Sequence, residues 1–282
     1  MKPAPLLRSV GLTAVSLLLA AGCGPKSSGG TSSCPVNDDL ISSFTADNGV
    51  YPTDGRAGGW FTYGDRSGFG TLDPVEGGAA VPDLDTGNPN CSGPGSLHVT
   101  STGFSDWGSA MGADFVPKVA ADAGGTAPGT YDATKYRGIA FWARSAAPIP
   151  FVQVAILDPY TENPSILPVA DQCMYVASDP AVNCSPYIVK FGYGYMGEAL
   201  TPVMEDFPKF ISTQIDTTWR RFEILFDDMK QDSTNPGRQS PGNHLLVTQT
   251  TGIRIQVNTD HSTSPPTPTN WELWLDDVSF VK

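Results

Sequence analysis

The sequence predicts an all-β fold built from many short strands joined by tight turns. The 282 residues include 30 Gly and 25 Pro, whereas charged residues make up only 16%, a composition typical of chains with frequent turns. Several segments alternate apolar and polar residues with the period of two that a strand requires. No segment shows a long helical period, and the length allows one large β domain or two small ones.

The first 22 residues are expected to be a bacterial lipoprotein signal peptide. Lys2 and Arg8 precede an apolar stretch too short to span a bilayer as a permanent helix. The stretch ends in LAAGC at 19–23, which resembles a lipobox whose Cys23 is acylated. An Asp directly after the acylated cysteine would resemble an inner-membrane retention signal, but this chain has Gly24 there. Anchoring at the outer membrane or cell surface is therefore expected. The alternative is an ordinary secretory peptide with a chance cysteine.

The rest of the chain divides into a tether and a domain. Residues 23–33 are rich in Gly and Ser and are expected to be a flexible tether. Residues 34–282 contain no internal repeat, and their loops are too long for two independent cores. They are therefore predicted to form one domain.

Four cysteines remain after Cys23 is assigned to lipidation. An even number in an oxidising compartment predicts disulfides, and four cysteines allow three connectivities. The short spacing of Cys173 and Cys184 predicts that they pair, which leaves Cys34 for Cys91. The cysteines contain no CxxC motif and the three histidines are scattered, so a zinc site is not indicated.

Strands are expected first at 40–44, 60–63, 96–102 and 107–115. Gly-rich and Pro-rich segments at 72–95 and 120–129 are expected to be surface loops. In the stretch YDATKYRGIAFWAR at 131–144, a polar turn leads into a strand with two different faces. Ile139, Phe141 and Ala143 form an aliphatic face for the core, and Trp142 and Arg144 lie on the other.

The same alternation recurs in later strands. FVQVAILD at 151–158 turns Gln153 outward, and GIRIQVN at 252–258 turns Arg254, Gln256 and Asn258 outward. Residues 217–231 predict a strand followed by one helical turn, and the segment 159–212 is irregular. In the C-terminal strand the inward parity changes, which predicts a bulge at Asp276-Asp277.

The order of these motifs, YxGIxFWARS, VxVxILD, TTWxxFxxxFDDMxQ, IxxQVN and WLDDVSF, resembles a known family. It is similar to the galactose-binding-like β-sandwiches, in particular the family-eleven carbohydrate-binding modules and similar modules on bacterial surface lipoproteins. The resemblance implies a jelly roll of two antiparallel sheets over most of the chain. It also implies a concave sheet face that holds a polysaccharide, and a structural calcium ion. The protein is expected to be monomeric.

The candidate sugar-binding residues are outward-facing side chains of these strands. Sugar C–H faces stack on aromatic rings, and sugar hydroxyls need planar donors and acceptors. The alternative is an ordinary solvated sheet face. The candidates are Tyr63, Trp142, Arg144, Gln153, Arg254, Gln256 and Asn258.

For calcium, the resemblance implies Asp276 and, after the first strand, Asp47. Calcium prefers oxygen ligands that converge from separate turns. The alternative is that both carboxylates accept hydrogen bonds from turn amides.

The expected function is that of a non-catalytic carbohydrate-binding surface lipoprotein. The net charge of −12 argues against nucleic acid as a partner. The sequence has no GxSxG, P-loop or HExxH motif. A glycoside hydrolase using Glu223 and Glu272 is a weaker alternative. The stronger alternative is a structural or adhesive lipoprotein that binds protein through a flat apolar patch.

Overall fold

The computed structural model describes residues 39–44, 49–65, 70–75, 82–84, 95–120, 126–149, 152–159, 161, 187–191, 210–211, 214–231, 245–259 and 264–282. The chain separates into two units, Met1–Ser33 and Cys34–Lys282, and every described residue belongs to the second. No helix in these ranges is long and apolar enough to cross a membrane.

The first half of the described chain contains eight strands. They are β1 (Asp39–Ser42), β2 (Trp60–Gly64), β3 (Thr71–Asp73), β4 (Pro82–Leu84), β5 (Gly95–Thr102), β6 (Gly108–Asp114), β7 (Val116–Ala120) and β8 (Thr126–Gly129).

The second half contains eight more strands and two short 3-10 helices. They are β9 (Gly138–Ser145), β10 (Val152–Leu157), β11 (Tyr187–Phe191), β12 (Phe210–Ile211), β13 (Arg220–Leu225), η3 (Phe226–Asp228), β14 (Lys230–Gln231), η5 (Val247–Gln249), β15 (Gly252–Asn258) and β16 (Trp271–Val281).

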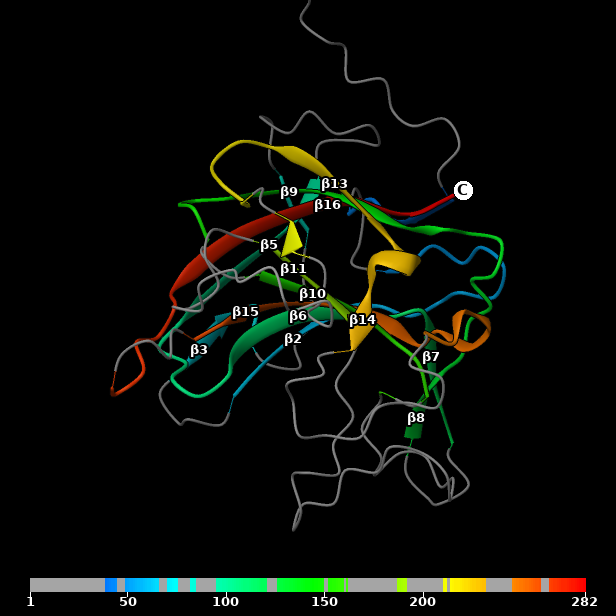
Figure 1. Cartoon of the computed structure of the whole chain (residues 1–282), viewed down its shortest axis with the longest axis horizontal. Coiled ribbons are helices and arrows are strands. Elements are labelled where there is room, and N and C mark those ends of the chain that lie inside the picture. The colour runs from blue at the N-terminus through cyan, green and yellow to red at the C-terminus, as the bar shows by residue number, and fades with distance from the viewer. Residues whose placement is uncertain are drawn as a thin grey trace, which may run out of the picture. The chain divides into compact units, whose positions relative to one another are not determined.

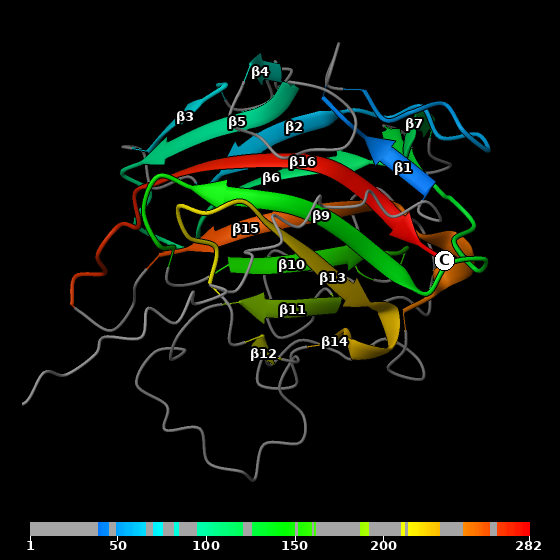
Figure 2. The same ribbon diagram turned by 90° about the horizontal axis from the view of Figure 1, so that it is seen from above.

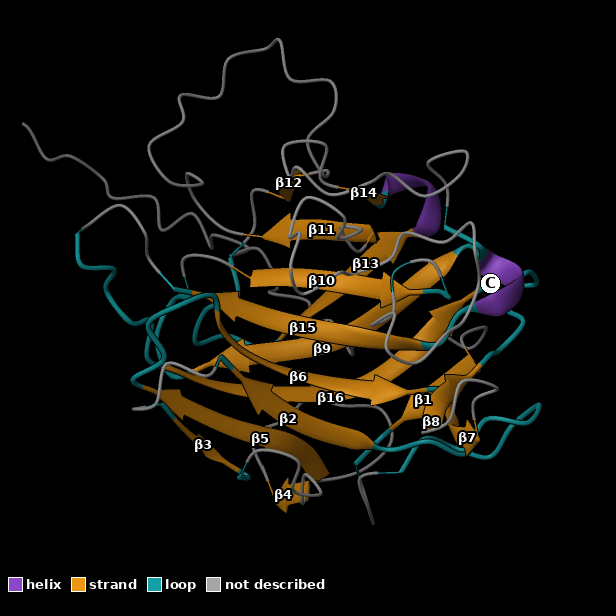
Figure 3. Cartoon of the chain, turned by 90° about the horizontal axis from the view of Figure 1, so that it is seen from below, coloured by secondary structure: helices purple, strands orange, loops and turns teal. Residues whose placement is uncertain are grey.

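These strands form two main sheets that lie one above the other (Figure 1). The β16 sheet has the order β13-β9-β16-β5-β3, with β1 paired to β16 and β4 to β5. Figure 2 shows β16 between β9 and β5. The β15 sheet has the order β12-β11-β10-β15-β6-β2, with β14 paired to β11, and Figure 3 shows β15 between β10 and β6. All pairs are antiparallel except β11 with β12, so the predicted two-sheet antiparallel β-sandwich is confirmed.

The core lies between the sheets and is made by the residues that alternation predicted to face inward. Ile139, Phe141 and Ala143 of β9 and Ile253, Ile255 and Val257 of β15 are all at most 1% exposed. Their burial stabilises the fold because apolar area leaves water, at about 25 cal/mol per Å².

Buried polar contacts also cross between the sheets. The Trp271 indole N–H donates to Ser109 Oγ over 3.0 Å, and the Trp60 indole N–H donates to Ser42 Oγ over 2.9 Å. These bonds satisfy polar groups inside the core and hold the two sheets in one alignment.

The C-terminal strand has the predicted bulge. The pairing of β16 with β9 shifts register between Asp276 and Ser279, and Asp277 has φ of +45°. This shift explains why the inward parity changes from Leu275 to Val278.

Two predicted loops contain strands, and the predicted helical turn is shorter than expected. The segment 72–95 was expected to be a loop, but Leu72 and Pro82 lie in short strands that pair with β5. The segment 120–129 was also expected to be a loop, but β7 and β8 form a two-stranded sheet. The helical turn was expected at 227–231, but η3 ends at Asp228, and Lys230–Gln231 pair with β11. In each case backbone pairing with a neighbour overrides weak local propensity.

Candidate functional site on the β15 sheet

The seven candidate binding residues do not share one face. Tyr63, Gln153 and the three β15 residues lie on strands of the β15 sheet, but Trp142 and Arg144 lie on β9, which pairs with β13 and β16 in the other sheet. The expectation that β9 lines the same groove as β10 and β15 is therefore wrong. Alternation shows which side chains face the core, but strands of both sheets have the same inward pattern.

The outward side chains of the β15 sheet form what we call the β15 face. Strand β6 lies between β15 and β2 and contributes small residues at two outward positions. Gly112 lies between Phe61 of β2 and Arg254 of β15, and Ala110 lies between Tyr63 and Gln256. Because β6 has no large outward side chain at these two positions, the aromatic residues of β2 and the polar residues of β15 lie on either side of a strip of small residues.

Three aromatic rings follow one edge of this face. The ring centroids of Phe61 and Tyr63 are 5.9 Å apart, and those of Tyr63 and Trp107 are 5.8 Å apart. All three side chains are half-buried, so part of each ring is available to solvent. Of these rings, Tyr63 alone was predicted as a binding residue, although Phe61 has the same strand parity. Trp107 was expected to begin the strand at 107–115, but it precedes β6.

Amides lie across the strip from these rings. The Gln256 Nε2 donates to Asn258 Oδ1 over 2.7 Å, and Gln153 of β10 is the cross-strand partner of Gln256. These three side chains are half-buried. The amides therefore offer both donors and acceptors beside a row of aromatic rings.

Arg254 is held inside the face by its own neighbours. Its Nη2 donates to Asp114 Oδ1 over 2.8 Å, and its Nη1 donates to the Ala113 and Ile253 carbonyls over 2.9 Å. The guanidinium Cζ lies 4.8 Å from the centre of the Phe61 ring. The side chain of Arg254 is 12% exposed and that of Asp114 is 9% exposed, so this pair supports the face from within.

Gly112 makes this arrangement possible. A Cβ atom at this position would lie 2.4 Å from Arg254 Cδ and 2.8 Å from the Ile253 carbonyl oxygen. Only glycine lets the arginine cross β6 to reach Phe61.

Trp142 and Arg144 lie on the outer face of the β16 sheet. The guanidinium of Arg144 covers Trp274 with Cζ 3.7 Å from the ring centre, and His98 stacks on the same indole at 4.3 Å with an interplanar angle of 2°. Arg144 also lies 5.6 Å from the Trp219 ring. The Arg144 guanidinium therefore stacks on an aromatic ring of the protein itself.

The two glutamates considered for a hydrolase both contact basic side chains. Glu272 Oε1 lies 2.9 Å from His98 Nε2, and Glu223 accepts hydrogen bonds from Arg137 and Arg221, each over 2.9 Å. Glu223 lies on β13 and Glu272 on β16, with β9 between them.

The predicted calcium site is only partly within the described residues. Asp276 is fully buried and its Oδ1 accepts a 2.7 Å hydrogen bond from the Asp277 N–H. Among the described residues, no group of three His, Cys, Asp or Glu side chains could hold a metal ion. Asp47 lies outside the described ranges, and calcium binding stays a prediction.

The predicted lipidation and disulfide residues also lie outside the described ranges. They are Cys23, Cys34, Cys91, Cys173 and Cys184.

Fold and site together define an antiparallel β-sandwich with an outer sheet face lined by aromatic rings and amides. No family model matches the sequence, and no curated protein matches it. Solved structures with a similar fold include a family 11 carbohydrate-binding module from Clostridium thermocellum, in complex with a β-1,3-1,4-mixed-linked tetrasaccharide. The similarity covers 88% of this chain and 97% of that chain, at 11% identity and a TM-score of 0.44.

Two further structures have lower scores. A family 30 carbohydrate-binding module of a Clostridium thermocellum cellulosomal cellulase is similar over 87% of this chain and 97% of that chain, with 10% identity and a TM-score of 0.42. A β-1,2-glucanase from Parabacteroides distasonis is similar over 87% of this chain but 25% of that chain, with 9% identity and a TM-score of 0.32.

Proposed function

We propose that this protein binds a polysaccharide or oligosaccharide on the β15 face without cleaving it. The observation that carries the proposal is the row of half-buried rings, Phe61, Tyr63 and Trp107, facing the amides of Gln256 and Asn258 across small residues of β6. Rings offer a surface to sugar C–H groups, and amides supply the paired donors and acceptors that hydroxyl groups need.

The competing adhesive function needs a flat apolar patch. Within the described ranges, the exposed large hydrophobic residues are Tyr51 and Val75, and neither lies on a strand of the β15 sheet. The mixed aromatic and amide character of the β15 face suits a hydroxylated ligand better than an apolar protein surface.

We further propose that the domain is tethered at the outer membrane or cell surface through a lipid on Cys23. The support is the lipobox-like LAAGC at 19–23 and the Gly-rich and Ser-rich segment that follows it. A tethered sandwich would hold an extracellular glycan near the cell.

Calorimetry with soluble β-glucans, xylans and galactans tests the binding proposal. Tyr63→Ala and Gln256→Ala are each expected to weaken binding about tenfold, which corresponds to about 1.4 kcal/mol. Trp142→Ala is the matched control, because it removes a half-buried aromatic side chain from the opposite sheet and is expected to leave affinity unchanged.

Two results would overturn the proposal. One is a native protein that binds no glycan in this panel or on a broad glycan array. The other is loss of affinity in Trp142→Ala while Tyr63→Ala and Gln256→Ala bind normally.

A further inference from the structure

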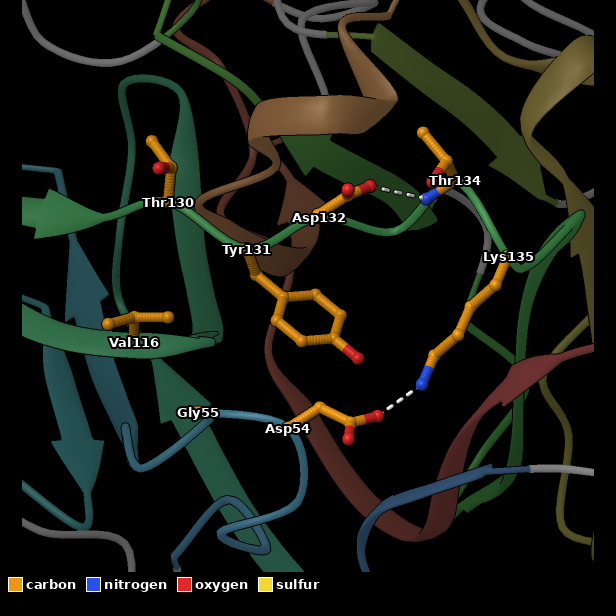
Figure 4. Close-up of a pocket in the computed structure, with 8 residues that line it drawn as sticks. All are labelled: Asp54, Gly55, Val116, Thr130, Tyr131, Asp132, Thr134 and Lys135. Carbon is orange, nitrogen blue, oxygen red and sulfur yellow. Dashed lines mark hydrogen bonds and ion pairs between the residues drawn. The ribbon is translucent and has the colours of Figure 1, made fainter.

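A separate pocket of about 350 Å³ lies between two turns (Figure 4). Its lining residues include none of the side chains named above for the β15 face. One wall is the turn at Asp54 and Gly55, and another is the turn that follows Tyr131. Its lining residues are Asp54, Gly55, Val116, Thr130, Tyr131, Asp132, Thr134 and Lys135.

Both turns have defined backbone conformations. Asp54 and Gly55 have φ of +57° and +86°, the left-handed region that a tight turn requires. Asp132 Oδ1 accepts a 3.0 Å hydrogen bond from the Thr134 N–H, which closes the second turn. The pocket walls are therefore largely preformed.

The second turn is anchored to the sandwich through Tyr131. The Tyr131 N–H donates to the Thr250 carbonyl over 2.7 Å, and the Thr250 hydroxyl donates to the Tyr131 carbonyl over 2.9 Å. Tyr131 is only 4% exposed. An ion pair between Lys135 and Asp54 then joins the two turns (Figure 4).

Hydrogen-bond donors and acceptors both line this pocket. The hydrogen bond with Asp54 raises the pKa of Lys135, so the ammonium stays protonated. The backbone hydrogen bond from Thr134 lowers the pKa of Asp132, so that carboxylate is ionised at neutral pH. Figure 4 shows the Lys135 ammonium, the Asp54 carboxylate and the Tyr131 hydroxyl directed toward the same space.

We propose that this pocket binds one neutral sugar unit. The volume lies in the range of small-molecule sites and is large enough for a hexose. Hydroxyl groups can donate to Asp54 and accept from Lys135, whereas Val116 provides an apolar side. The two aspartates against a single lysine disfavour an anionic ligand. The site would capture a monosaccharide or a chain end independently of the β15 face.

Saturation-transfer NMR with the whole domain tests this inference. The probes are glucose, galactose, mannose and xylose, with glucuronate and glucosamine as charged probes. At least one neutral sugar is expected to receive saturation, and Lys135→Met and Asp54→Asn are each expected to weaken its binding at least tenfold in a titration. Both side chains are about half exposed, so these variants are expected to fold.

Matched controls separate the pocket from general charge effects and from the β15 face. Lys282→Met and Asp227→Asn remove the same groups from exposed positions outside the pocket and are expected to bind normally, as is Tyr63→Ala. Thr130→Trp introduces a large side chain at the pocket wall and is expected to abolish the signal.

Several outcomes would overturn the inference. They are the absence of saturation transfer to every neutral sugar, binding of glucosamine or glucuronate alone, and unchanged affinity in both Lys135→Met and Thr130→Trp. Loss of monosaccharide binding in Tyr63→Ala alone would assign the sugar to the β15 face, and would leave the proposed function standing while removing this one.

Discussion

For Arg254, the alternation of apolar and polar residues predicts the direction of the side chain but not its ion-pair partner. The pattern of β15 correctly turns Arg254 away from the core, whereas its neighbours Ile253 and Ile255 are buried. Its partner Asp114 is far away in the sequence, and only the antiparallel pairing of β15 with β6 brings the two together. The sequence therefore predicted an outward guanidinium but not its internal ion pair.

Breaking this ion pair is expected to destabilise the domain. Arg254→Met keeps an aliphatic side chain over Phe61 but leaves the mostly buried Asp114 carboxylate without its cation, which costs about 3 kcal/mol. Urea denaturation measures the change in the free energy of unfolding. Asp114→Asn in the Arg254→Met background is expected to recover part of that loss.

A double-mutant cycle provides the control for this prediction. The coupling energy between the two positions is expected to be at least about 1 kcal/mol. Additive effects of the two substitutions would show that the contact does not contribute to stability.

At the scale of single elements, β1 is attached through a buried polar cluster. Asp39 Oδ1 lies 2.6 Å from Arg56 Nη2, and Asp39 Oδ2 accepts a hydrogen bond from the Tyr136 hydroxyl. Arg56 is 1% exposed, and its Cζ lies 5.4 Å from the ring centres of Tyr131 and Phe280. The cluster joins the first strand to the last strand and to the turn before β9.

This cluster predicts acid sensitivity of the domain. Burial opposes ionisation of Asp39, but the hydrogen bonds from Tyr136 and Arg56, with the charges of Arg56 and Lys135, lower its pKa below the ordinary value. A lowered folded-state pKa contributes stability above the unfolded pKa of about 3.9 and loses that contribution as pH falls through the folded pKa.

Asp39→Asn tests this contribution. The variant is expected to be less stable than the native domain at pH 7, with the difference shrinking below pH about 4. Thermal melting between pH 2 and pH 7 measures both curves, and Asp227→Asn, at an exposed position, is the matched control. Parallel curves for native protein and Asp39→Asn over this range would refute the prediction.

Predictions for single strands were correct where the sequence of that strand alone determines the feature. Ile139, Phe141 and Ala143 were assigned to the core by alternation and are fully buried. The bulge at Asp276 was predicted because the parity change lies within one strand. Sheet membership was not, because β9 and β15 have the same inward pattern and only pairing with β13 or β10 distinguishes them.

At the scale of the whole molecule, the outer faces of the two sheets differ in the surroundings of their aromatic rings. On the β16 sheet, Trp274 is covered on both sides by His98 and Arg144, so its ring faces are already occupied. On the β15 face, Tyr63 and Trp107 remain half-buried beside amides. This difference supports the proposal that the β15 sheet carries the binding surface.

The proposed tether is a whole-molecule property with its own test. Cys23→Ser is expected to release the protein from the membrane fraction and to abolish labelling by a fatty-acid probe, because the acylated thiol would be absent. Fractionation and labelling of cells that express the two forms measure this. Unchanged labelling of the Cys23→Ser protein would show that the lipid is not attached there.

Glycan binding on the β15 face is tested most directly by mapping the bound glycan through amide chemical-shift changes in NMR, using the soluble domain and a glycan that binds in calorimetry. The largest shifts are expected for residues of β2, β6 and β15 around Tyr63, Ala110 and Gln256. Shifts concentrated instead on β9 and β16, around Trp142 and Trp274, would show that the glycan binds the opposite sheet.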